Sequence, residues 1–477
     1  MEVIMEIRFY NSMSRTKEVF KPISGNKVGL YTCGPTVYNY AHIGNFRAYV
    51  FEDLLRRTLE YFGHEVTHVM NLTDVDDKTI RGAMDAGVSL DDYTAPYKRA
   101  FFDDCAALRI ERATVYPAAT DHIPEMIDLI AILLDKGVAY KSDDGSIYFS
   151  IDQFPAYGKL SRVDMENQRS GGRVKLDEYA KDSVADFALW KAWDEKDGDV
   201  FWESPWGRGR PGWHIECSAM SMKYLGKTFD IHTGGIDNMF PHHEDEIAQS
   251  EAATGERFVN YWLHCGYLVV NGEKMSKSLG NFFTLRDLRG KGWSDREIRA
   301  ALLAGHYRKM LDFSESALER TRSALKSFDS LFDRLVRRAA GSGDGDVSAE
   351  TADALSSAEA DFERSIADDL NIAGGWAAAH AIAKHANKTL DANALSAEGA
   401  GKILDLFRSF DRVLASLDVP DSAADAAVPA EVAELVKRRS AAREARDFAE
   451  ADAIRDKLKE LGWMVEDTPD GPIAKKL

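Results

Sequence analysis

The chain has 477 residues, of which 45% are apolar, and a formal net charge of −18 at neutral pH. This composition predicts a large buried core shared among two to four domains, and the negative charge excludes a simple basic nucleic-acid binder, leaving only local basic patches for such contacts. No apolar run approaches the ~20 residues that a membrane span needs, and the N-terminal residues lack the pattern of a signal peptide. Four cysteines, at positions 33, 105, 217 and 265, have no paired spacing, so we expect no disulfides and a cytoplasmic protein.

The first elements of functional interest are an apolar strand at residues 28–32, a turn at 33–45, an amphipathic helix at 43–62 and a second strand at 66–72. Together they predict a right-handed strand–helix–strand crossover, a unit whose ligands bind beyond the carboxyl ends of the strands. The helix begins at the run His42-Ile43-Gly44, where free backbone N–H groups favour phosphate and Gly44 lets a nucleotide approach the backbone. Cys33 ends the first strand at the same edge. Taken alone, such a cysteine is more often a packed thiol, and the triplet is a weak signal.

The middle of the chain places polar residues after the second strand and then an insertion. Asp74, Asp76 and Asp77 follow that strand, where they could bind Mg²⁺ or cap the next helix, and capping is the commoner outcome. Helical patterns at 91–108 and 123–136 lead to a region at 139–201 of short strand-like pieces and Gly- and Asp-rich turns. We read this region as an insertion between two halves of a parallel sheet.

The second half of the predicted sheet begins after an aromatic and basic turn at 205–214. A helix at 215–225 carries Cys217, and a strand at 228–233 leads to another helix that starts near Pro241 and carries His242 and Glu246. We take a short strand at 267–270 as the last of the sheet, followed by a glycine-bounded basic loop at 272–281. The predicted fold is therefore α/β, with a doubly wound, Rossmann-like parallel sheet.

The rest of the chain is predicted to be mainly helical. Helical patterns continue from about residue 284, with a loop at 341–348 and an Ala/Asp/Pro linker at 420–429. The tail then has a helix that stops at Gly462 and a small closing hairpin. A helical bundle domain and a small C-terminal α+β domain should thus follow the sheet.

Four side chains at the predicted ligand edge are of the types that Zn²⁺ accepts, namely Cys33, Cys217, His242 and Glu246. His242 and Glu246 are four residues apart and share one helix face. The spacing is too wide for a zinc finger, so two core thiols, a surface histidine and a helix-face glutamate are the alternative interpretation. His243 is an alternative ligand, although it faces about 100° away from His242 on a helix.

Lys274 and Lys277 lie in the glycine-bounded loop, where they could neutralise the charge of a leaving pyrophosphate. The alternative is a solvated basic loop. Their order in the chain favours the first interpretation, because the His-Ile-Gly turn opens the first crossover and Lys274-Met275-Ser276-Lys277-Ser278 follows the last strand.

This pair of motifs resembles the signature sequences of class I aminoacyl-tRNA synthetases, and the match is much closer to the cysteinyl-tRNA synthetases. The similar segments are 31–38, 71–78, 186–191, 205–220, 229–250 and 274–283, with 367–371 and 446–452 beyond the catalytic region. One departure is Asn45, where the commonest form of the signature has a second histidine. Asn45 can still donate a hydrogen bond, so the resemblance leaves its role weakened rather than lost.

The resemblance implies a role for each matching position. Cys33, Cys217, His242 and Glu246 would hold one Zn²⁺ ion. His42 and Asn45 match the phosphate-binding motif, Lys277 matches the ATP-contacting lysine, and Lys274 would help it to stabilise charge on the phosphates. The positions that would surround the cysteine and the adenylate are Thr73, Trp213, His232 and Asp237.

The implied reaction is activation of L-cysteine with ATP and Mg²⁺, followed by transfer of the cysteinyl group to the 3′-terminal adenosine of tRNA(Cys). An apolar pocket separates cysteine from serine poorly, whereas a thiolate bound to zinc is a contact that serine cannot reproduce. By resemblance the chain is a monomer. Its expected domains are a catalytic domain at 1–285 with an insertion at roughly 113–204, a stem-contacting region at 286–330, a helical bundle at 331–419 and an anticodon-recognition domain at 430–477.

Two other readings remain open from the sequence. A cysteine ligase of thiol biosynthesis that acylates an amino sugar would share the catalytic domain but lack the C-terminal tRNA-recognition region. A non-catalytic tRNA-binding relative would not need intact phosphate and metal motifs. Because the tail from residue 431 and all these motifs are present, we expect the tRNA-charging enzyme.

Overall fold

The computed structural model describes residues 5–162, 186–275, 280–341, 345–420, 430–468 and 471–476. Within this described part of the chain, no helix is long and apolar enough to cross a membrane. The chain divides into two compact units. The first comprises Met1–Phe328, Asp353–His385 and Leu406–Leu417, and the second comprises Asp329–Ala352, Ala386–Asp405 and Asp418–Leu477.

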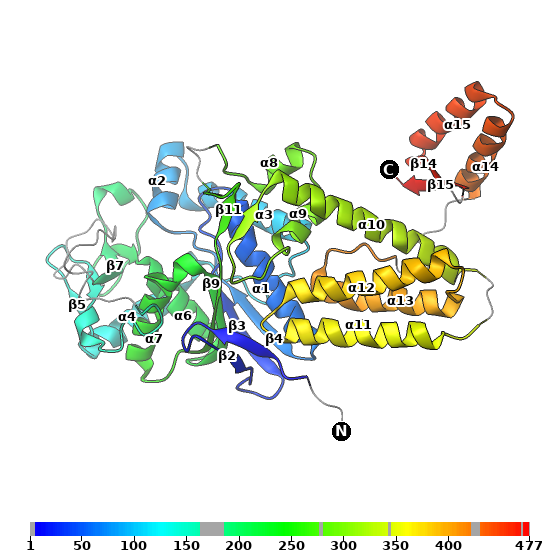
Figure 1. The fold of residues 1–477 in the computed structure, drawn as a ribbon. Coiled ribbons are helices and arrows are strands. Elements are labelled where there is room, and N and C mark those ends of the chain that lie inside the picture. The colour runs from blue at the N-terminus through cyan, green and yellow to red at the C-terminus, as the bar shows by residue number, and fades with distance from the viewer. Residues whose placement is uncertain are drawn as a thin grey trace. The chain divides into compact units, whose positions relative to one another are not determined.

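The first unit is built on a parallel sheet with the strand order β10-β9-β3-β4 (Figure 1). Its strands are β3 (Lys27–Thr32), β4 (Glu65–Met70), β9 (Phe229–Gly235) and β10 (Val259–Cys265). Thr32 pairs with Thr233 at the carboxyl ends of the two central strands. The residue after β3 and the last residues of β9 therefore lie together at one edge, where ligands bind in such sheets.

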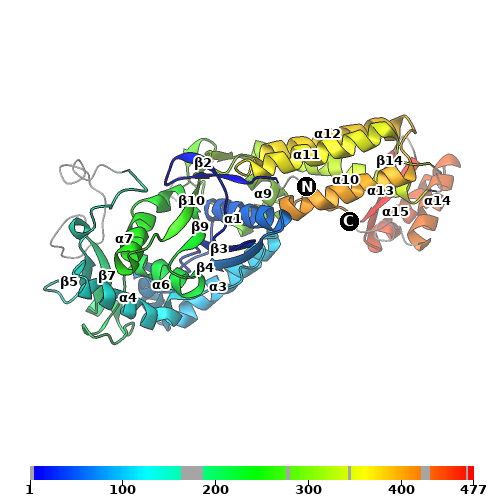
Figure 2. The same cartoon turned by 90° about the horizontal axis from the view of Figure 1, so that it is seen from below.

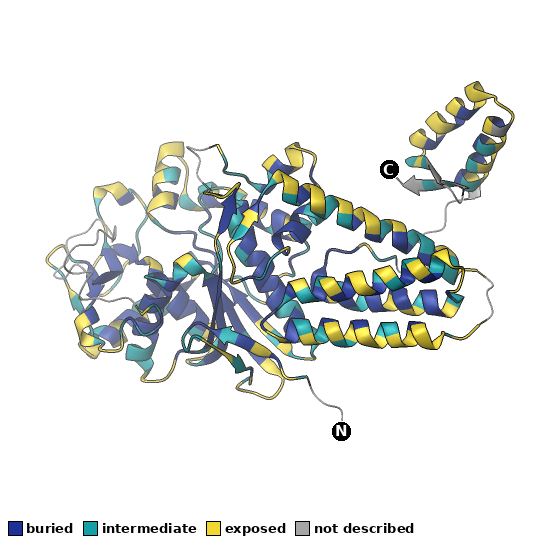
Figure 3. Cartoon of the chain, in the orientation of Figure 1, coloured by how far each residue is buried: buried dark blue, intermediate teal, exposed yellow. Residues whose placement is uncertain are grey.

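Helices cover both faces of the sheet, which confirms the predicted doubly wound class. Helix α1 (Ile43–Tyr61) lies on one face, and α6 (Trp213–Leu225) and α7 (His242–Thr254) lie on the other (Figure 2). The strands are buried almost throughout, as Figure 3 shows, because both of their faces are covered. The α1 helix buries Val50, Leu54 and Leu55 toward the sheet, as its apolar spacing predicts.

The inserted region forms a sheet of its own, antiparallel and in the order β5-β6-β7-β8. Its strands are β5 (Ala139–Lys141), β6 (Ile147–Phe149), β7 (Phe187–Ala192) and β8 (Gly209–Pro211). Three helices precede it, namely α2 (Asp77–Ala86), α3 (Leu90–Ala107) and α4 (Ile123–Asp135). The chain then returns to the parallel sheet through α6, so the insertion separates the two halves of that sheet.

The prediction for the last strand was wrong. The strand that completes the parallel sheet is β10, which the sequence pattern did not single out, and β11 (Leu268–Val270) belongs to a separate sheet. That small sheet has the order β12-β11-β13, with β12 at Glu273–Lys274 and β13 at Leu311–Phe313. Polar Asn260 and His264 interrupt the apolar pattern of β10, whereas β11 is apolar throughout. A hairpin of β1 (Arg8–Asn11) and β2 (Thr16–Val19) was also not predicted.

Helices dominate the remainder of the chain, as expected. Two short helices, α8 (Leu285–Gly290) and α9 (Asp295–Leu302), precede four long ones, α10 (Glu315–Ala339), α11 (Ala349–Ala367), α12 (Ile372–Asp391) and α13 (Ala397–Leu414). The tail contains α14 (Ala430–Glu444), α15 (Phe448–Glu460) and the predicted hairpin of β14 (Trp463–Thr468) and β15 (Gly471–Lys476). Most of the predicted linker, residues 421–429, lies outside the described residues.

Candidate active site

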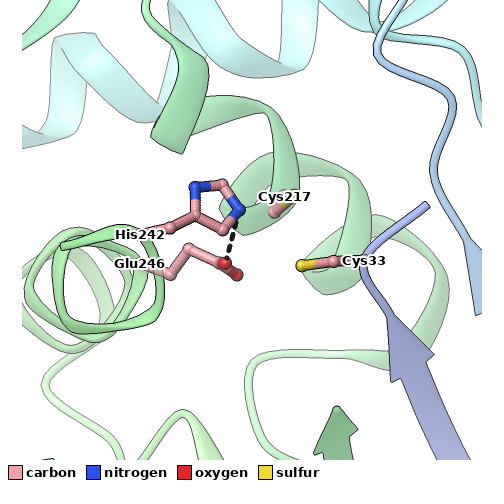
Figure 4. A group of neighbouring side chains, drawn as sticks. All are labelled: Cys33, Cys217, His242 and Glu246. Atoms are coloured by element: carbon pink, nitrogen blue, oxygen red, sulfur yellow. Dashed lines mark ion pairs between the residues drawn. The ribbon is translucent and has the colours of Figure 1, made fainter. Parts of the chain in front are cut away.

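A cluster of two cysteines, a histidine and a glutamate lies at the ligand edge of the parallel sheet (Figure 4). Cys33 follows β3, Cys217 comes from α6, and His242 and Glu246 come from the first and fifth positions of α7. One ligand atom from each lies within 4.8 Å of the others. The structure thus brings together the four residues that the sequence proposed as metal ligands, and these donors could hold a metal ion.

A second set of four residues at the same place shares Cys33 and Glu246 and adds His232 and His243. His243 Nε2 lies 3.3 Å from Cys33 Sγ, although His243 is one residue along α7 from His242. Its other ring nitrogen lies 2.9 Å from His264 Nε2, and His264 Nδ1 lies 2.8 Å from Ser12 Oγ. The two sets overlap, so His243 remains an alternative ligand.

The His242 ring is fixed on three sides. Its Nε2 lies 3.1 Å from Glu246 Oε1, its Nδ1 lies 2.8 Å from His214 Nδ1, and the Trp213 ring stacks on it at 4.2 Å between centroids. His214 Nε2 lies 3.2 Å from Asp245 Oδ2. Asp245 therefore orients the His214 ring, and His214 in turn orients the His242 ring. Such an arrangement commonly fixes the tautomer of a metal-binding histidine.

Burial favours the uncharged forms of the side chains in the cluster. It lowers the pKa of His242 to about 3, and it raises the pKa of Glu246 to about 8. The pKa of the Cys217 thiol is raised by burial as well. Although His242 is near, Glu246 Oε1 has no hydrogen-bond partner among the described residues. A bound divalent cation would balance the negative charge of the carboxylate and thiolates that form when the ligand protons leave. Two sulfurs, one nitrogen and one oxygen are donors that Zn²⁺ accepts, so the residues fit the metal.

His232 adjoins the cluster from β9. Its Nε2 lies 2.9 Å from Glu246 Oε2 and its Nδ1 lies 3.2 Å from the Thr233 carbonyl oxygen. If Nδ1–H donates to that carbonyl, Nε2 accepts a proton from Glu246, in agreement with the raised pKa of this carboxyl. Asp237 follows on a short 3-10 helix, Ile236–Met239, and Trp213 at the start of α6 is 44% exposed.

Thr73 joins the turn after β3 to the turn after β4. Its hydroxyl donates to Glu216 Oε2 at 2.9 Å and accepts from Asn71 Nδ2 at 3.1 Å, while Asn71 Oδ1 accepts the Gly34 N–H at 2.9 Å. A Cβ on Gly34 would overlap the Asn71 carbonyl group, so only glycine allows this approach. Burial raises the pKa of Glu216 well above its usual value.

The start of α1 is a reciprocal cap. His42 is the N-cap residue, and its Nδ1 accepts the Asn45 N–H at 3.2 Å while Asn45 Oδ1 accepts the His42 N–H at 3.1 Å. An asparagine thus completes a capping box that usually has a longer acceptor at this position. Burial lowers the pKa of His42, which keeps its ring neutral.

Residues before and after the basic loop lie close to the start of α1. A Cβ on Gly44 would lie 2.9 Å from the His42 ring and 3.1 Å from Met275 Cε, so the glycine lets these groups close over the turn. After the loop, the Ile43 N–H donates to the Phe283 carbonyl oxygen at 3.0 Å. Lys274 is exposed on β12, whereas Lys277 lies outside the described residues.

The aspartates after β4 have structural partners. Asp76 caps α2 and accepts the N–H groups of Lys78 and Thr79, both at 2.8 Å, which confirms the capping interpretation for this residue. Asp74 binds Lys98 at 2.7 Å. These carboxylates are therefore occupied by the chain itself.

Sequence reasoning did not single out His214, Glu216, Asp245 and His264, which position the predicted residues. The available signals were weak. His214 and Glu216 lie in the first turn of α6, and Asp245 adjoins Glu246 on α7. Which neighbour each residue contacts depends on how α6 packs against α7 and the turn after β4, and on how β10 packs against α7.

Comparison with known proteins agrees with this geometry. Residues 19–323 match the model of the class I (C) tRNA synthetase catalytic domain, and residues 425–471 match that of the cysteinyl-tRNA ligase anticodon binding domain. A cysteine–tRNA ligase of Protochlamydia amoebophila is 50% identical over 473 residues, which cover 98% of each chain. One from Brachyspira hyodysenteriae is 50% identical over 470 residues, again 98% of each chain.

Solved structures show the same fold at low identity. Methionyl-tRNA synthetase of Mycobacterium tuberculosis, in complex with methionyl-adenylate, has a TM-score of 0.66 at 15% identity and covers 84% of this chain and 93% of its own. A ternary complex of LeuRS from Agrobacterium radiobacter has a TM-score of 0.59 at 12% identity, covering 85% and 87%. With near-complete coverage at half identity by the curated relatives, the chain belongs to the cysteine–tRNA ligase family of class I tRNA synthetases.

Proposed function

We propose that this chain activates L-cysteine with ATP and transfers the cysteinyl group to the 3′-terminal adenosine of tRNA(Cys). The observation that carries the proposal is that a cluster of soft metal-donor side chains and the start of α1 lie at one edge of one sheet. The near-complete similarity to proteins named cysteine–tRNA ligase supports it.

In the first step, a carboxylate oxygen of cysteine attacks the α-phosphorus of ATP bound with Mg²⁺, and pyrophosphate leaves. His42, Asn45, Lys274 and Lys277 would stabilise charge that develops on the phosphates, an effect of about 3 kcal/mol per well-placed donor. In the second step, a ribose hydroxyl of the tRNA attacks the acyl carbon, and AMP leaves. Lys277→Ala should slow the first step far more than it weakens binding of cysteine, and equal effects on both would contradict its role.

The metal that we propose is one Zn²⁺ ion held by Cys33, Cys217, His242 and Glu246. When bound, it would accept the substrate thiolate as a further ligand and so favour cysteine over serine, whose hydroxyl is a harder and far less acidic donor. His214, Asp245 and Trp213 would hold His242 in position for this contact. Two neutral thiols and a raised Glu246 pKa imply that ligand protons leave as the metal binds.

Residues around the cluster would hold cysteine and its adenylate. Thr73 is fixed by Glu216 and Asn71, and His232 by Glu246 and Thr233, so both are set before substrate arrives. Trp213 and Asp237 are the exposed members of this group. Asp237 completes the set that we propose, from the turn after β9.

The remaining regions would recognise the tRNA. We propose that residues 1–285 form the catalytic domain, with an insertion at about 113–204, and that 286–330 contact the acceptor stem. The helical bundle at 331–419 would link them to an anticodon-recognition domain at 430–477, where the similarity at 425–471 supports this role. Four free thiols fit the reducing cytoplasm, and we also propose that the chain is a monomer.

The test is ATP-dependent transfer of labelled cysteine onto total tRNA, with serine as a competitor. We expect cysteine to be transferred and serine to be neither transferred nor an effective competitor. Formation of cysteinyl-adenylate without charged tRNA would instead identify another acceptor, such as an amino sugar. Charging of serine at a comparable rate would contradict selection by a metal-bound thiolate.

A further inference from the structure

The turn between α11 and α12 contains two buried residues in a strained backbone conformation. Asp369 has φ of 59° and the following Leu370 has φ of 54°, and both side chains are fully buried. Residues other than glycine rarely adopt this left-handed region, least of all two in succession. Strained turns persist where surrounding contacts hold them, so the contacts of Asp369 indicate what the turn is for.

The Asp369 carboxylate contacts three consecutive residues of one segment. Its Oδ1 accepts the Tyr307 hydroxyl at 2.6 Å, and its Oδ2 accepts Arg308 Nε at 2.8 Å and lies 3.5 Å from His306 Nε2. Oδ1 also accepts the N–H of Tyr10 at 2.9 Å. We call residues 305–313 the strap. The Asp369 side chain thus joins the turn between α11 and α12 to the strap.

The other side of the strap is attached to α1, the helix that begins at His42. Arg47 donates to the carbonyl oxygens of Gly305 and His306, at 3.2 and 3.0 Å. The Tyr307 ring stacks on Phe51 at 4.4 Å and nearly parallel. The strap therefore lies between Asp369 and the helix whose first turn we assign to phosphate binding.

The end of the strap is continuous with the strand that bears Lys274. Its last residues form β13, which pairs with β11, and β11 pairs with β12 through Val269 and Lys274. Asp312 Oδ1 also accepts the Gly272 N–H at 3.0 Å, in the turn between β11 and β12. A shift of the strap would therefore move Lys274 relative to His42.

We propose that Asp369 is a positioning residue for the nucleotide step, since it fixes the strap and thereby the position of the Lys274 strand relative to the start of α1. It touches no reacting atom. This inference rests on the proposed function, because it assigns the phosphate step to these two elements. The turn between α11 and α12 would thus act on the proposed ATP site through the strap and the small sheet β12-β11-β13.

The test is Asp369→Asn, which keeps the size of the side chain but removes the charge that pairs with Arg308. We expect the kcat of cysteine-dependent ATP–pyrophosphate exchange to fall about tenfold, because small displacements of catalytic groups cost this much or more. The KM for ATP should rise, while the KM for cysteine and the metal content per chain stay unchanged. The matched control is Asp368→Asn, since this neighbour is exposed and pairs with Lys17 at 2.7 Å, and we expect wild-type values.

A second variant keeps the inference testable if Asp369→Asn does not fold. Tyr307→Phe removes one donor to Asp369 and retains the ring that stacks on Phe51, so we expect a smaller change in the same direction. A lower melting temperature with unchanged kcat and KM would show a merely structural role and overturn the inference. Equal increases in the KM for ATP and cysteine would overturn it too. Absence of exchange by the wild-type chain would refute the proposed function instead.

Discussion

The candidate metal cluster of Cys33, Cys217, His242 and Glu246 and the turn at the start of α1, to which we assign phosphate binding, lie at one edge of the same sheet. The two are built in different ways. The cluster takes side chains from the residue after β3 and from α6 and α7, so its geometry exists only when these elements pack together. The phosphate turn is local, since His42 and Asn45 cap one another within four residues. We therefore expect substitutions in the cluster to abolish metal binding and substitutions in the turn to lower the rate of cysteine activation only in part.

The largest effect should follow loss of a cluster thiol. Cys217→Ala removes one of the proposed ligands, and even loss of a residue that merely orients a ligand costs about 10- to 100-fold in metal affinity. We expect zinc content to fall to near zero and cysteine activation by at least about a hundredfold. Metal analysis and pyrophosphate exchange measure the two effects.

The control for Cys217→Ala is Cys105→Ala, which truncates another buried thiol that lies on α3, outside the cluster. It should retain its metal. Equal zinc content in the wild type and in Cys217→Ala would refute the site, and loss from both variants would point to general destabilisation.

A smaller effect should follow loss of the residue that orients His242. His214→Asn breaks the chain from Asp245 to His242 but leaves all four proposed ligands. We expect metal affinity to fall by about 10- to 100-fold, with activity restored by added Zn²⁺. Titration with a competing chelator measures the affinity. His122→Asn is a suitable control, because His122 is buried and hydrogen-bonded to Ala118 and Tyr224 instead.

The sheet that carries both sites should be sensitive to acid. Burial lowers the pKa of His68 on β4 to about 3, and its Nε2 lies 2.9 Å from Thr32 Oγ1. The unfolded chain, with a histidine pKa near 6.5, binds more protons between these values, so the contribution of His68 is complete above about pH 6.5 and is lost as the pH falls toward 3. It amounts to at most about 1.4 kcal/mol per pH unit.

Denaturant unfolding at several pH values tests this contribution. His68→Gln should flatten the dependence between about pH 6.5 and 4, and metal content and activation should be lost together in the remaining transition. If the variant keeps the wild-type slope, His68 does not supply this proton uptake. If cysteine activation is lost at a clearly higher pH than bound metal, the two sites do not both depend on the stability of this sheet.

The same contrast explains what the sequence could predict. Helical and strand periodicity placed β3, α1, β4, α6 and α7 closely. Both candidate sites were predicted at one edge because their residues follow the carboxyl ends of the parallel strands. The strand β10 was missed, because Asn260 and His264 interrupt its apolar pattern and make their contacts only in the folded state, Asn260 through its carbonyl oxygen with Asn11 and His264 with Ser12. Likewise, no local pattern could pair His214 with His242 or Glu216 with Thr73, since each contact joins segments that only the tertiary fold brings together.

The smallest effect, and the one that best separates the two kinds of site, concerns Asn45. Asn45→Ala removes the acceptor for the His42 N–H, which costs about 1 kcal/mol of stability, and it also removes the amide that would donate to phosphate. Loss of about 1 kcal/mol of transition-state stabilisation from this donor should slow activation about fivefold, with metal content unchanged. Asn45→Asp retains that acceptor and adds a negative charge beside the phosphate site, so stability should persist while activation falls further. If Asn45→Asp activates cysteine as fast as the wild type, the residue serves only the helix, and its side chain takes no part in binding phosphate.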